Sequence, residues 1–302
     1  MSIEVNPLRI VAVVNPISGG GASKQQWPAV ADALATAGVT YVRVVESESS
    51  EHATAVAAES ARSGALTVAV GGDGHVRDVA EGVLSVDGAR LGIAAAGRGN
   101  DLVRHLGLPK DPAAIAAVLT GGATREIDVL DVRRPDGVTT IAVGNVYTGL
   151  DSEATELINS LRWMGSAAYR VAPVMAAVRW KPIRASITVD GQTRESLAHM
   201  VVVANSGDYG HGLRMVPTAS IDSGAVEVLL LRGDRSKYRL ARLMKQAETG
   251  SHLDRREVEL LSGTSITVAT DRPVPVHADG DYLCEAPVTI TVRPRALPIA
   301  VP

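Results

Sequence analysis

Short apolar runs alternate with helix-like segments up to about Gly121, and this alternation limits the fold more than any other feature. The strand-like runs are "RIVAVV" (Arg9–Val14), "VTYVRVV" (Val39–Val45), "ALTVAV" (Ala65–Val70) and "RLGIAAAG" (Arg90–Gly97). Ser49 or Ser50 caps a helix that stops at Gly64, and Asp111 caps one that ends before Gly121. Strands that alternate with helices pair in parallel through crossover connections, so we predict an α/β domain with a doubly wound, mostly parallel sheet.

The character of the chain changes near Glu126–Asp131, where strand-like segments begin to follow one another directly. These segments are "TREIDVLDVR", "TTIAVGNVYTG", "RASITVDGQTRES", "LAHMVVVANSG", "GAVEVLLLRG", "SITVATD" and "VTITVRP". Turn signals such as "VDGQ" lie between them, and helical insertions interrupt them at about residues 152–180 and 236–249. Many strands with few helices predict an antiparallel, β-sandwich-like second domain.

The composition excludes several classes of function. A net charge of −3 over 302 residues argues against a nucleic-acid binder, because affinity for phosphate backbones needs a basic excess. Cys284 is the only cysteine, which excludes an internal disulfide and fits a reducing cytoplasm. The first residues lack the pattern of a signal peptide, and no window reaches the roughly 18 apolar residues of a membrane span. We therefore expect a cytoplasmic protein that touches membranes peripherally.

Three glycine-rich loops in the first domain share one design. "NPISGGGAS" (Asn15–Ser23), "GGDGH" (Gly71–His75) and "GRGND" (Gly97–Asp101) each follow a strand and lead toward a helix. Amides at a helix N-terminus approach phosphate oxygens closely when no Cβ stands in the way. Neither the P-loop pattern nor the G-x-G-x-x-G fingerprint is present. One such loop alone is an ordinary turn, whereas three at the carboxyl edge of one sheet predict a nucleotide site.

These loops belong to a longer ordered set of motifs. "NPISGGG", "GGDG", "GRGNDLVRHLGLP", "GLDSEAT" and "HADGD" follow one another as in the diacylglycerol kinase catalytic family, which the chain resembles over nearly its whole length. The similarity is closest to soluble diacylglycerol kinases of actinobacteria; sphingosine kinases are relatives, and NAD kinases and phosphofructokinases are distant ones. The resemblance implies a NAD-kinase-like or phosphofructokinase-like domain over 1–128 with a returning segment at 288–302, and a β-rich lipid-substrate domain over 129–287.

The resemblance also implies an ATP site between the domains and gives the motifs roles. Phosphates and Mg²⁺ would be held by Asn15, Ser18, Gly19, Gly20, Gly72, Asp73, Gly74, His75, Gly97, Arg98, Asn100 and Asp101. Asp279 would be the general base for the lipid hydroxyl, with Asp281 beside it, and Asp151 would lie near the acceptor headgroup. Asp222 matches a position that helps to bind a second Mg²⁺ in some members, in addition to the metal near Asp73. A carboxylate is a suitable base because an alcohol does not ionise by itself, although "ADGD" is also favourable hairpin-turn chemistry.

The chain departs from the usual family pattern at these motifs. Where the family has Thr, Asn and Glu after "GGDG", this chain has His75, Arg77 and Asp78. Arg98 replaces the hydroxyl residue of the third loop, and Asp281 replaces a glutamate. Arg98 could pair with a phosphate bidentately and His75 could donate a hydrogen bond, which would compensate for the lost hydroxyls. The alternative is that both side chains point to solvent and nucleotide binding is weakened.

The stretch Glu156–Trp180 is the helical segment that bears most on the acceptor. Its apolar residues at helical spacing are Leu157, Leu161, Met164, Ala168, Val171 and Met175. Such a stripe is a core face in most proteins, and lipid contact is the alternative. Trp163 and Trp180 are candidate anchors at a membrane interface.

The sequence therefore predicts a peripheral lipid kinase that uses MgATP, with diacylglycerol as the expected acceptor and phosphatidic acid as the product. The alternatives are a kinase of the same fold for a sphingoid base, an isoprenoid alcohol or a glycolipid, and a non-catalytic protein that binds nucleotide or lipid. The expected partner is a lipid at the membrane surface and not a nucleic acid. A homodimer is left open.

Overall fold

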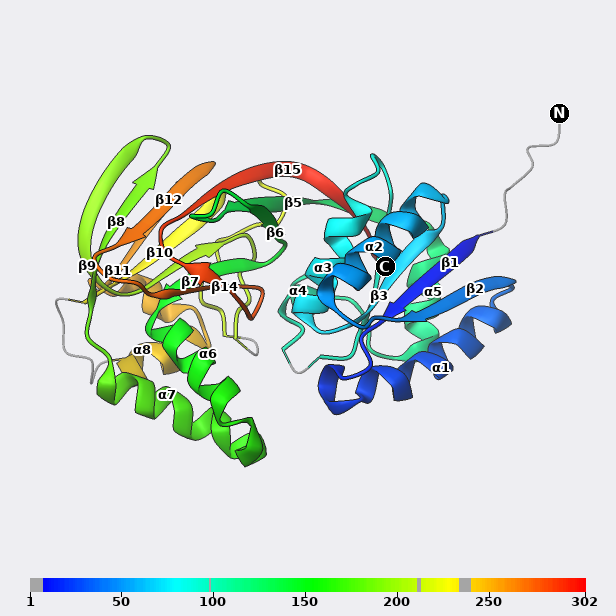
Figure 1. Ribbon diagram of the computed structural model, residues 1–302, viewed down its shortest axis with the longest axis horizontal. Coiled ribbons are helices and arrows are strands. Elements are labelled where there is room, and N and C mark those ends of the chain that lie inside the picture. The colour runs from blue at the N-terminus through cyan, green and yellow to red at the C-terminus, as the bar shows by residue number, and fades with distance from the viewer. Residues whose placement is uncertain (1–7, 98, 211–212, 234–239) are drawn as a thin grey trace. The chain divides into compact units, whose positions relative to one another are not determined.

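The computed structural model describes residues 8–97, 99–210, 213–233 and 240–302 (Figure 1). The chain divides into two compact units. The first unit comprises Met1–Ile127 with Arg295–Pro302, and the second comprises Asp128–Pro294. The returning segment thus starts at Arg295 and not at residue 288, because the first part of its strand pairs within the second unit.

Parallel strands form the sheet of the first unit. They are β1 (Arg9–Val14), β2 (Tyr41–Glu46), β3 (Leu66–Gly71) and β4 (Leu91–Ala95). Their order is β2-β1-β3-β4, and the end of β15 (Val288–Ala300) adds in parallel beside β4, where Ile299 pairs with Leu91. β1, β3 and β4 are almost entirely buried, which is typical of strands covered by helices on both faces.

Helices cover both faces of this sheet. They are α1 (Ala22–Thr36), α2 (Ser50–Arg62), α3 (Asp73–Val83), α4 (Asp101–His105) and α5 (Pro112–Gly121), with a short 3-10 helix, η1, at Ser18–Gly20. α1 and α5 pack over one set of alternating strand residues, and α2 packs with α3. The caps form as predicted: Ser49 Oγ accepts from the His52 amide at 3.1 Å, and Asp111 Oδ1 accepts from the Ala114 amide at 3.0 Å. The doubly wound α/β prediction is confirmed.

The second unit is built mainly from antiparallel strands. They are β5 (Thr124–Arg133, which begins in the first unit), β6 (Thr139–Ala142), β7 (Asn145–Gly149), β8 (Ile183–Val189), β9 (Gln192–Ala204), β10 (Val226–Arg232), β11 (Val258–Gly263), β12 (Ser265–Thr270), β13 (Pro275–Ala278), β14 (Asp281–Glu285) and the start of β15. The path runs β14-β13-β7-β9-β8-β12-β15, and β10 joins β9 to β11.

The long strand β9 separates two hydrophobic cores of the second unit. Val201 and Val203 point into one core with residues of β8, β12 and β15, whereas Met200 and Val202 point into the other. Successive side chains of a strand point to opposite faces, so β9 is buried on both sides. This arrangement agrees with the predicted sandwich-like domain.

The helices of the second unit are shorter than the sequence pattern suggested. They are α6 (Leu150–Ser160), the 3-10 helix η2 (Arg162–Ala167), α7 (Ala168–Arg179), α8 (Leu240–Ala247) and the 3-10 helix η4 (Ser251–Asp254). The expected continuous stretch is interrupted at Gly165, whose φ of +60° and ψ of −132° are not helical. Part of the second predicted insertion lies outside the described residues.

Candidate functional site

The three glycine loops of the first unit touch at the carboxyl ends of β1, β3 and β4. The Gly72 amide donates to Ser18 Oγ at 3.3 Å, and the Ala96 amide donates to the Gly71 carbonyl at 2.8 Å. A Cβ at Gly97 would lie 2.5 Å from Gly72 Cα, so the second and third loops meet this closely because both positions are glycine. The structure thus brings the loop motifs together at one edge of the sheet.

The first loop is a tight coil of glycine backbone. Along Gly19–Gly21 the φ angles are +61°, +74° and +96°, a region that other residues adopt at a cost. A Cβ at Gly19 would lie 2.2 Å from the Ala96 carbonyl oxygen. Asn15 Oδ1 accepts from the Ile17 amide at 3.1 Å and so holds the start of the loop.

The second loop leads directly into helix α3. Gly72 occupies the N-cap position and provides no side-chain cap, and Asp73, Gly74 and His75 form the first turn. Amides in the first turn of a helix have no acceptor within the helix. Together with the helix dipole they favour a bound anion, so this end of α3 can receive a phosphate group.

Two carboxylates flank Gly99 in the third loop. A Cβ at Gly99 would lie 3.0 Å from Asp73 Oδ2 and 3.9 Å from Asp101 Oδ2. Asp73 Oδ1 accepts from the Leu102 amide at 3.4 Å, and Asp101 Oδ1 pairs with Arg104 at 2.7 Å. Mg²⁺ is usually held by one or two carboxylates together with substrate phosphates. The space that a side chain at residue 99 would fill is therefore lined by oxygens that suit such a cation.

The third loop is closed by the side chain of Asn100. Its Oδ1 accepts from the Gly97 amide at 3.0 Å, and its Nδ2 donates to the Gly97 carbonyl at 2.8 Å. The backbone of Asn100 lies in the left-handed region at φ +53°, where asparagine is favoured over most residues. Arg98, which was expected to replace a hydroxyl at the phosphates, lies outside the described residues.

His75 faces neither a phosphate nor solvent, so both sequence-based alternatives for it are corrected. Its side chain is buried, and Nε2 lies 2.9 Å from the Val13 carbonyl of β1, to which it donates. A Cβ at Gly71 would lie 2.7 Å from the imidazole ring, so a glycine there makes room for it. Burial lowers the pKa of His75, which favours the neutral ring. His75 therefore stabilises the second loop by tying it to strand β1.

Arg77 and Asp78, which also depart from the family pattern, pair with each other. Arg77 pairs with Asp78 at 3.0 Å, and both side chains are nearly buried. The Asp78 carbonyl accepts from Thr54 of α2 at 2.9 Å. The backbone of Asp78 therefore links α3 to α2, and its side chain pairs with Arg77.

In the second unit, the carboxylate of Asp279 accepts hydrogen bonds from three consecutive backbone amides. Oδ2 accepts from Val143 at 2.9 Å, and Oδ1 accepts from Gly144 at 2.8 Å and Asn145 at 3.1 Å. A Cβ at Gly144 would lie 2.8 Å from Oδ1, so a glycine is needed for this contact. The three amide donors fix the orientation of this carboxylate.

Asp279 and Gly280 form the turn between β13 and β14. Their φ angles are +51° and +90°, the pattern of a type I′ hairpin turn. Asp281 follows at the start of β14 and is exposed. The hairpin interpretation of "ADGD" is thus correct, and it is compatible with a functional carboxylate because the same turn presents Asp279 to the 143–145 backbone.

A cluster of aromatic rings beside this turn was not identified from the sequence. His277 is fully buried, its Nε2 lies 3.0 Å from Glu156 Oε1, and its ring stacks on Tyr147 with centroids 5.4 Å apart. Burial lowers the pKa of His277 against the opposing effect of Glu156, and burial raises the pKa of Tyr147. Tyr147 lies two residues before the "GLDSEAT" motif, which is the signal that could have indicated it.

Asp151 holds a carboxylate oxygen that has no protein partner. Oδ2 is buried and makes no hydrogen bond within the described part of the chain. Burial raises the pKa of Asp151 to about 7. Its negative charge also acts on the neighbouring Tyr147. A buried acceptor without a donor is costly, and a ligand hydroxyl would supply one.

Asp222 was expected to bind a second Mg²⁺, and one of its oxygens is engaged by a neighbouring serine. Its Oδ1 accepts from Ser220 Oγ at 2.8 Å. Within the described residues there is no group of three or more acidic, histidine or cysteine side chains that could hold a metal. The nearby Asp128 is fully buried and accepts from the Gly224 amide through Oδ2 at 2.6 Å, so this carboxylate organises the loop through the protein backbone.

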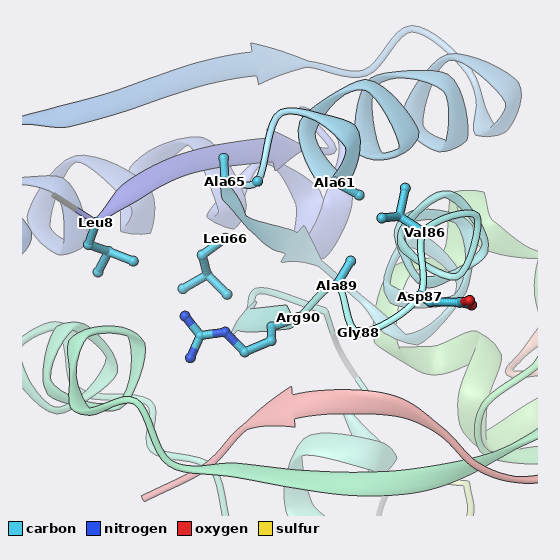
Figure 2. A pocket seen from close by; sticks show the side chains of 10 residues that line it. Leu8, Ala61, Ala65, Leu66, Val86, Asp87, Gly88, Ala89 and Arg90 are labelled. Carbon is cyan, nitrogen blue, oxygen red and sulfur yellow. The ribbon is translucent and has the colours of Figure 1, made fainter. Parts of the chain in front are cut away.

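One cavity of the first unit lies away from the predicted residues. It has a volume of about 230 Å³ and is lined by residues that precede or begin strands, among them Leu8, Leu66 and Arg90 (Figure 2). These residues stand at the amino ends of the strands, whereas the glycine loops stand at the carboxyl ends. The cavity and the loop site are therefore separate features. In the described part of the chain, no helix has the length and apolar character of a membrane span.

The whole chain matches known lipid kinases. Residues 9–132 match the diacylglycerol kinase catalytic domain, and residues 144–301 match the YegS C-terminal NAD kinase beta sandwich-like domain. A diacylglycerol kinase of Mycobacterium tuberculosis is 30% identical over 298 residues, covering 97% of this chain and 95% of that protein. A diacylglycerol kinase of Bacillus subtilis is 24% identical and covers 89% of this chain and 88% of its own.

A solved structure shares the fold. The crystal structure of a diacylglycerol kinase from Bacillus anthracis covers 97% of both chains with a TM-score of 0.78 at 21% identity. With two domain models matched in order and a relative that spans nearly all of it, the chain belongs to the diacylglycerol kinase family and is a lipid kinase.

Proposed function

We propose that this protein uses MgATP to phosphorylate the free hydroxyl of diacylglycerol, which yields phosphatidic acid and ADP. The observation that carries the proposal is the uncapped N-terminus of α3, enclosed by three touching glycine loops with two carboxylates beside it. The relatives named diacylglycerol kinase support the choice of acceptor. We further propose that it acts from the cytoplasm at a membrane surface, where a lipid acceptor and ATP meet.

In this proposal the glycine loops bind the triphosphate through backbone amides. The first turn of α3, with Asp73 and Gly74, would face phosphate oxygens, and the coil from Ser18 to Gly20 would cover them. Asn15, Gly97 and Asn100 would act by holding the loops in shape, because their side chains or backbone are engaged within the loops. His75 would act only through its bond to Val13.

Asp73 and Asp101 would hold Mg²⁺, since their oxygens flank the space beside Gly99. When bound, this cation would neutralise phosphate charge that the two carboxylates would otherwise repel. Asp222, whose Oδ1 accepts from Ser220 Oγ, would hold the second Mg²⁺ that the sequence predicts.

The second unit would handle the acceptor. The hydroxyl oxygen would form a bond to the γ-phosphorus while the bond from that phosphorus to the bridging oxygen of ADP breaks. The hydroxyl proton would pass to Asp279, whose position is fixed by the 143–145 amides. Asp151 would accept a hydrogen bond from the acceptor headgroup through its unpartnered Oδ2, and Asp281 would add charge near the same turn.

A direct test is transfer of radiolabelled phosphate from ATP to a total lipid extract, followed by identification of the product. We expect label in phosphatidic acid, and none with an Asp279→Asn variant. Label in a different lipid would show that the protein is a kinase with another acceptor. MgATP binding without transfer to any lipid would overturn the catalytic proposal and leave a nucleotide-binding protein.

A further inference from the structure

An apolar stripe faces solvent on helix α7 and the segment before it. Val171, Val174 and Val178 lie three and four residues apart and are 37%, 63% and 66% exposed. Trp163 in η2 is 81% exposed, more than any other large apolar side chain of the described residues. Residues at this spacing share one face of a helix, so the valines form a continuous strip.

The opposite face of α7 already supplies the packing of this helix. Ala168, Ala172 and Ala176 are at most 3% exposed, and α7 packs against α6. The valines are therefore surplus to the core. Contiguous exposed apolar side chains on a soluble protein mark an interaction surface.

Exposed cations follow the strip along the chain, at and just after the C-terminal end of α7. Arg179, Lys181 and Arg184 are exposed, and none forms an ion pair within the described residues. Trp180, which the sequence analysis offered as a second interfacial anchor, is only 6% exposed and packs under Arg272. The tryptophan available to a partner is thus Trp163.

We propose that Trp163, Val171, Val174 and Val178, with Arg179, Lys181 and Arg184, form a surface that docks on an anionic lipid bilayer. We call it the α7 surface. Valine side chains would enter the acyl boundary, tryptophan prefers the headgroup level, and the cations would meet anionic headgroups. The inference rests on the proposed lipid acceptor and adds the face by which the protein reaches it.

Charge favours a bilayer over a second copy of the chain. In a two-fold dimer the same patch meets itself, so the contact would gather six cations and no carboxylate of the patch. An anionic bilayer offers opposite charge together with an apolar layer. The bilayer therefore satisfies both parts of the α7 surface.

Tryptophan fluorescence provides a test that needs no kinase activity. Of the three tryptophans, Trp27 and Trp180 are 4% and 6% exposed, so a change on docking reports Trp163. With vesicles of phosphatidylcholine and phosphatidylglycerol in equal parts, we expect a blue shift and quenching by brominated acyl chains. Both the blue shift and the quenching should vanish in a Trp163→Phe variant that keeps the three valines. This variant should still sediment with the vesicles.

Vesicle sedimentation of further variants tests the rest of the α7 surface. A Val171→Asp/Val174→Asp variant should bind vesicles at least about tenfold more weakly, since charge is expelled from the acyl boundary. Arg179→Gln/Lys181→Gln should lose about thirtyfold at low salt and little at high salt, at roughly 1 kcal/mol per cation. Matched controls are Val138→Asp, at a valine that is 51% exposed, and Arg133→Gln, at an exposed arginine of the β5–β6 hairpin.

These outcomes are separable from failure of the proposed function. The α7 variants should keep normal transfer to a short-chain diacylglycerol that is dissolved as monomers, and lose activity only on vesicles. Equal vesicle binding by the α7 variants and their controls would overturn the α7 surface even in an active kinase. A fluorescence shift that depends on protein concentration without vesicles would also overturn it, in favour of a second copy.

Discussion

The two candidate sites of this molecule are formed by different parts of the polypeptide. In the first unit the candidate site is formed mainly by backbone. Gly72 and Gly97 approach each other closely because neither has a side chain, and the amides of the first turn of α3 lie beside them. In the second unit the site is side chains: Asp279, Tyr147 and His277 gather at the β13–β14 turn and β7.

This difference determines how each site fails. A backbone site is damaged by an added atom, because its geometry depends on the absence of a Cβ. A side-chain site is damaged by an altered or removed group, because a charge or a hydrogen bond is lost. The following variants test this contrast, in order of decreasing effect.

Asp279→Asn should have the largest effect. Loss of the proposed base should lower turnover by about 10²–10⁴-fold, as measured by initial rates of lipid phosphorylation. The amide Nδ2 of asparagine would also face the amide of Val143 or Gly144, donor against donor, so stability should fall as well.

Asp190→Asn separates these two consequences. Asp190 also has a positive φ, of +45°, and accepts from the amides of Thr264 and Ser265 in the same unit. It should show a similar loss of stability with normal turnover per folded molecule. Equal turnover losses in the two variants would mean that Asp279 is purely structural.

Gly97→Ala should break the backbone site. Its Cβ would lie 2.5 Å from Gly72 Cα and 2.6 Å from Asn100 Oδ1. Strain of about 1–3 kcal/mol would weaken MgATP binding by at least about fivefold in isothermal titration. Gly121→Ala is the matched control, since nothing lies within 4 Å of its added Cβ. If the two variants bound MgATP equally well, the close approach of Gly72 would not be the reason for a glycine at residue 97.

His75→Ala should affect stability more than nucleotide binding. Leaving the Val13 carbonyl without its donor and opening a cavity should cost about 1–3 kcal/mol of unfolding free energy, whereas the KM for ATP should stay near that of the wild type. Because the folded pKa of His75 is lowered, its contribution is present above about pH 6.5 and is lost as the pH falls. A large rise in the KM for ATP at unchanged stability would instead indicate that His75 contacts the phosphates.

Asp151→Asn should give the smallest change, visible as a trend with pH. The raised pKa means that Asp151 contributes stability below about pH 4, which is lost as the pH rises through about 7. The variant should therefore gain stability relative to wild type across this range, by a fraction of the limiting slope of about 1.4 kcal/mol per pH unit. Urea unfolding at several pH values measures it, and a constant difference would show that the carboxylate is well solvated.

Features that depend on neighbouring residues could be predicted from the sequence. The parallel strands, the caps at Ser49 and Asp111 and the three glycine loops each follow from a few consecutive residues. The break at Gly165 was missed, because an isolated glycine inside an apolar pattern does not reveal whether its φ is positive.

Features that depend on distant contacts could not be predicted. The His75 side chain is oriented by its bond to the Val13 carbonyl, and His277 bonds to Glu156 on α6. The loop position of His75 suggested a ligand contact, whereas its side chain is buried and donates to the Val13 carbonyl. The amide partners of Asp279 lie on a loop far away in the sequence, and no local pattern marks them.

Strand β15 also sets the order in which the protein is completed during synthesis. The first unit needs Ile299 beside Leu91, and the Val301 amide bonds to Ala123, so its sheet stays open at one edge until residues 295–302 have left the ribosome. By then every strand of the second unit has been made. A nascent chain thus completes its first unit last, and one that stops within β15 has an unfinished first unit however well the rest has folded.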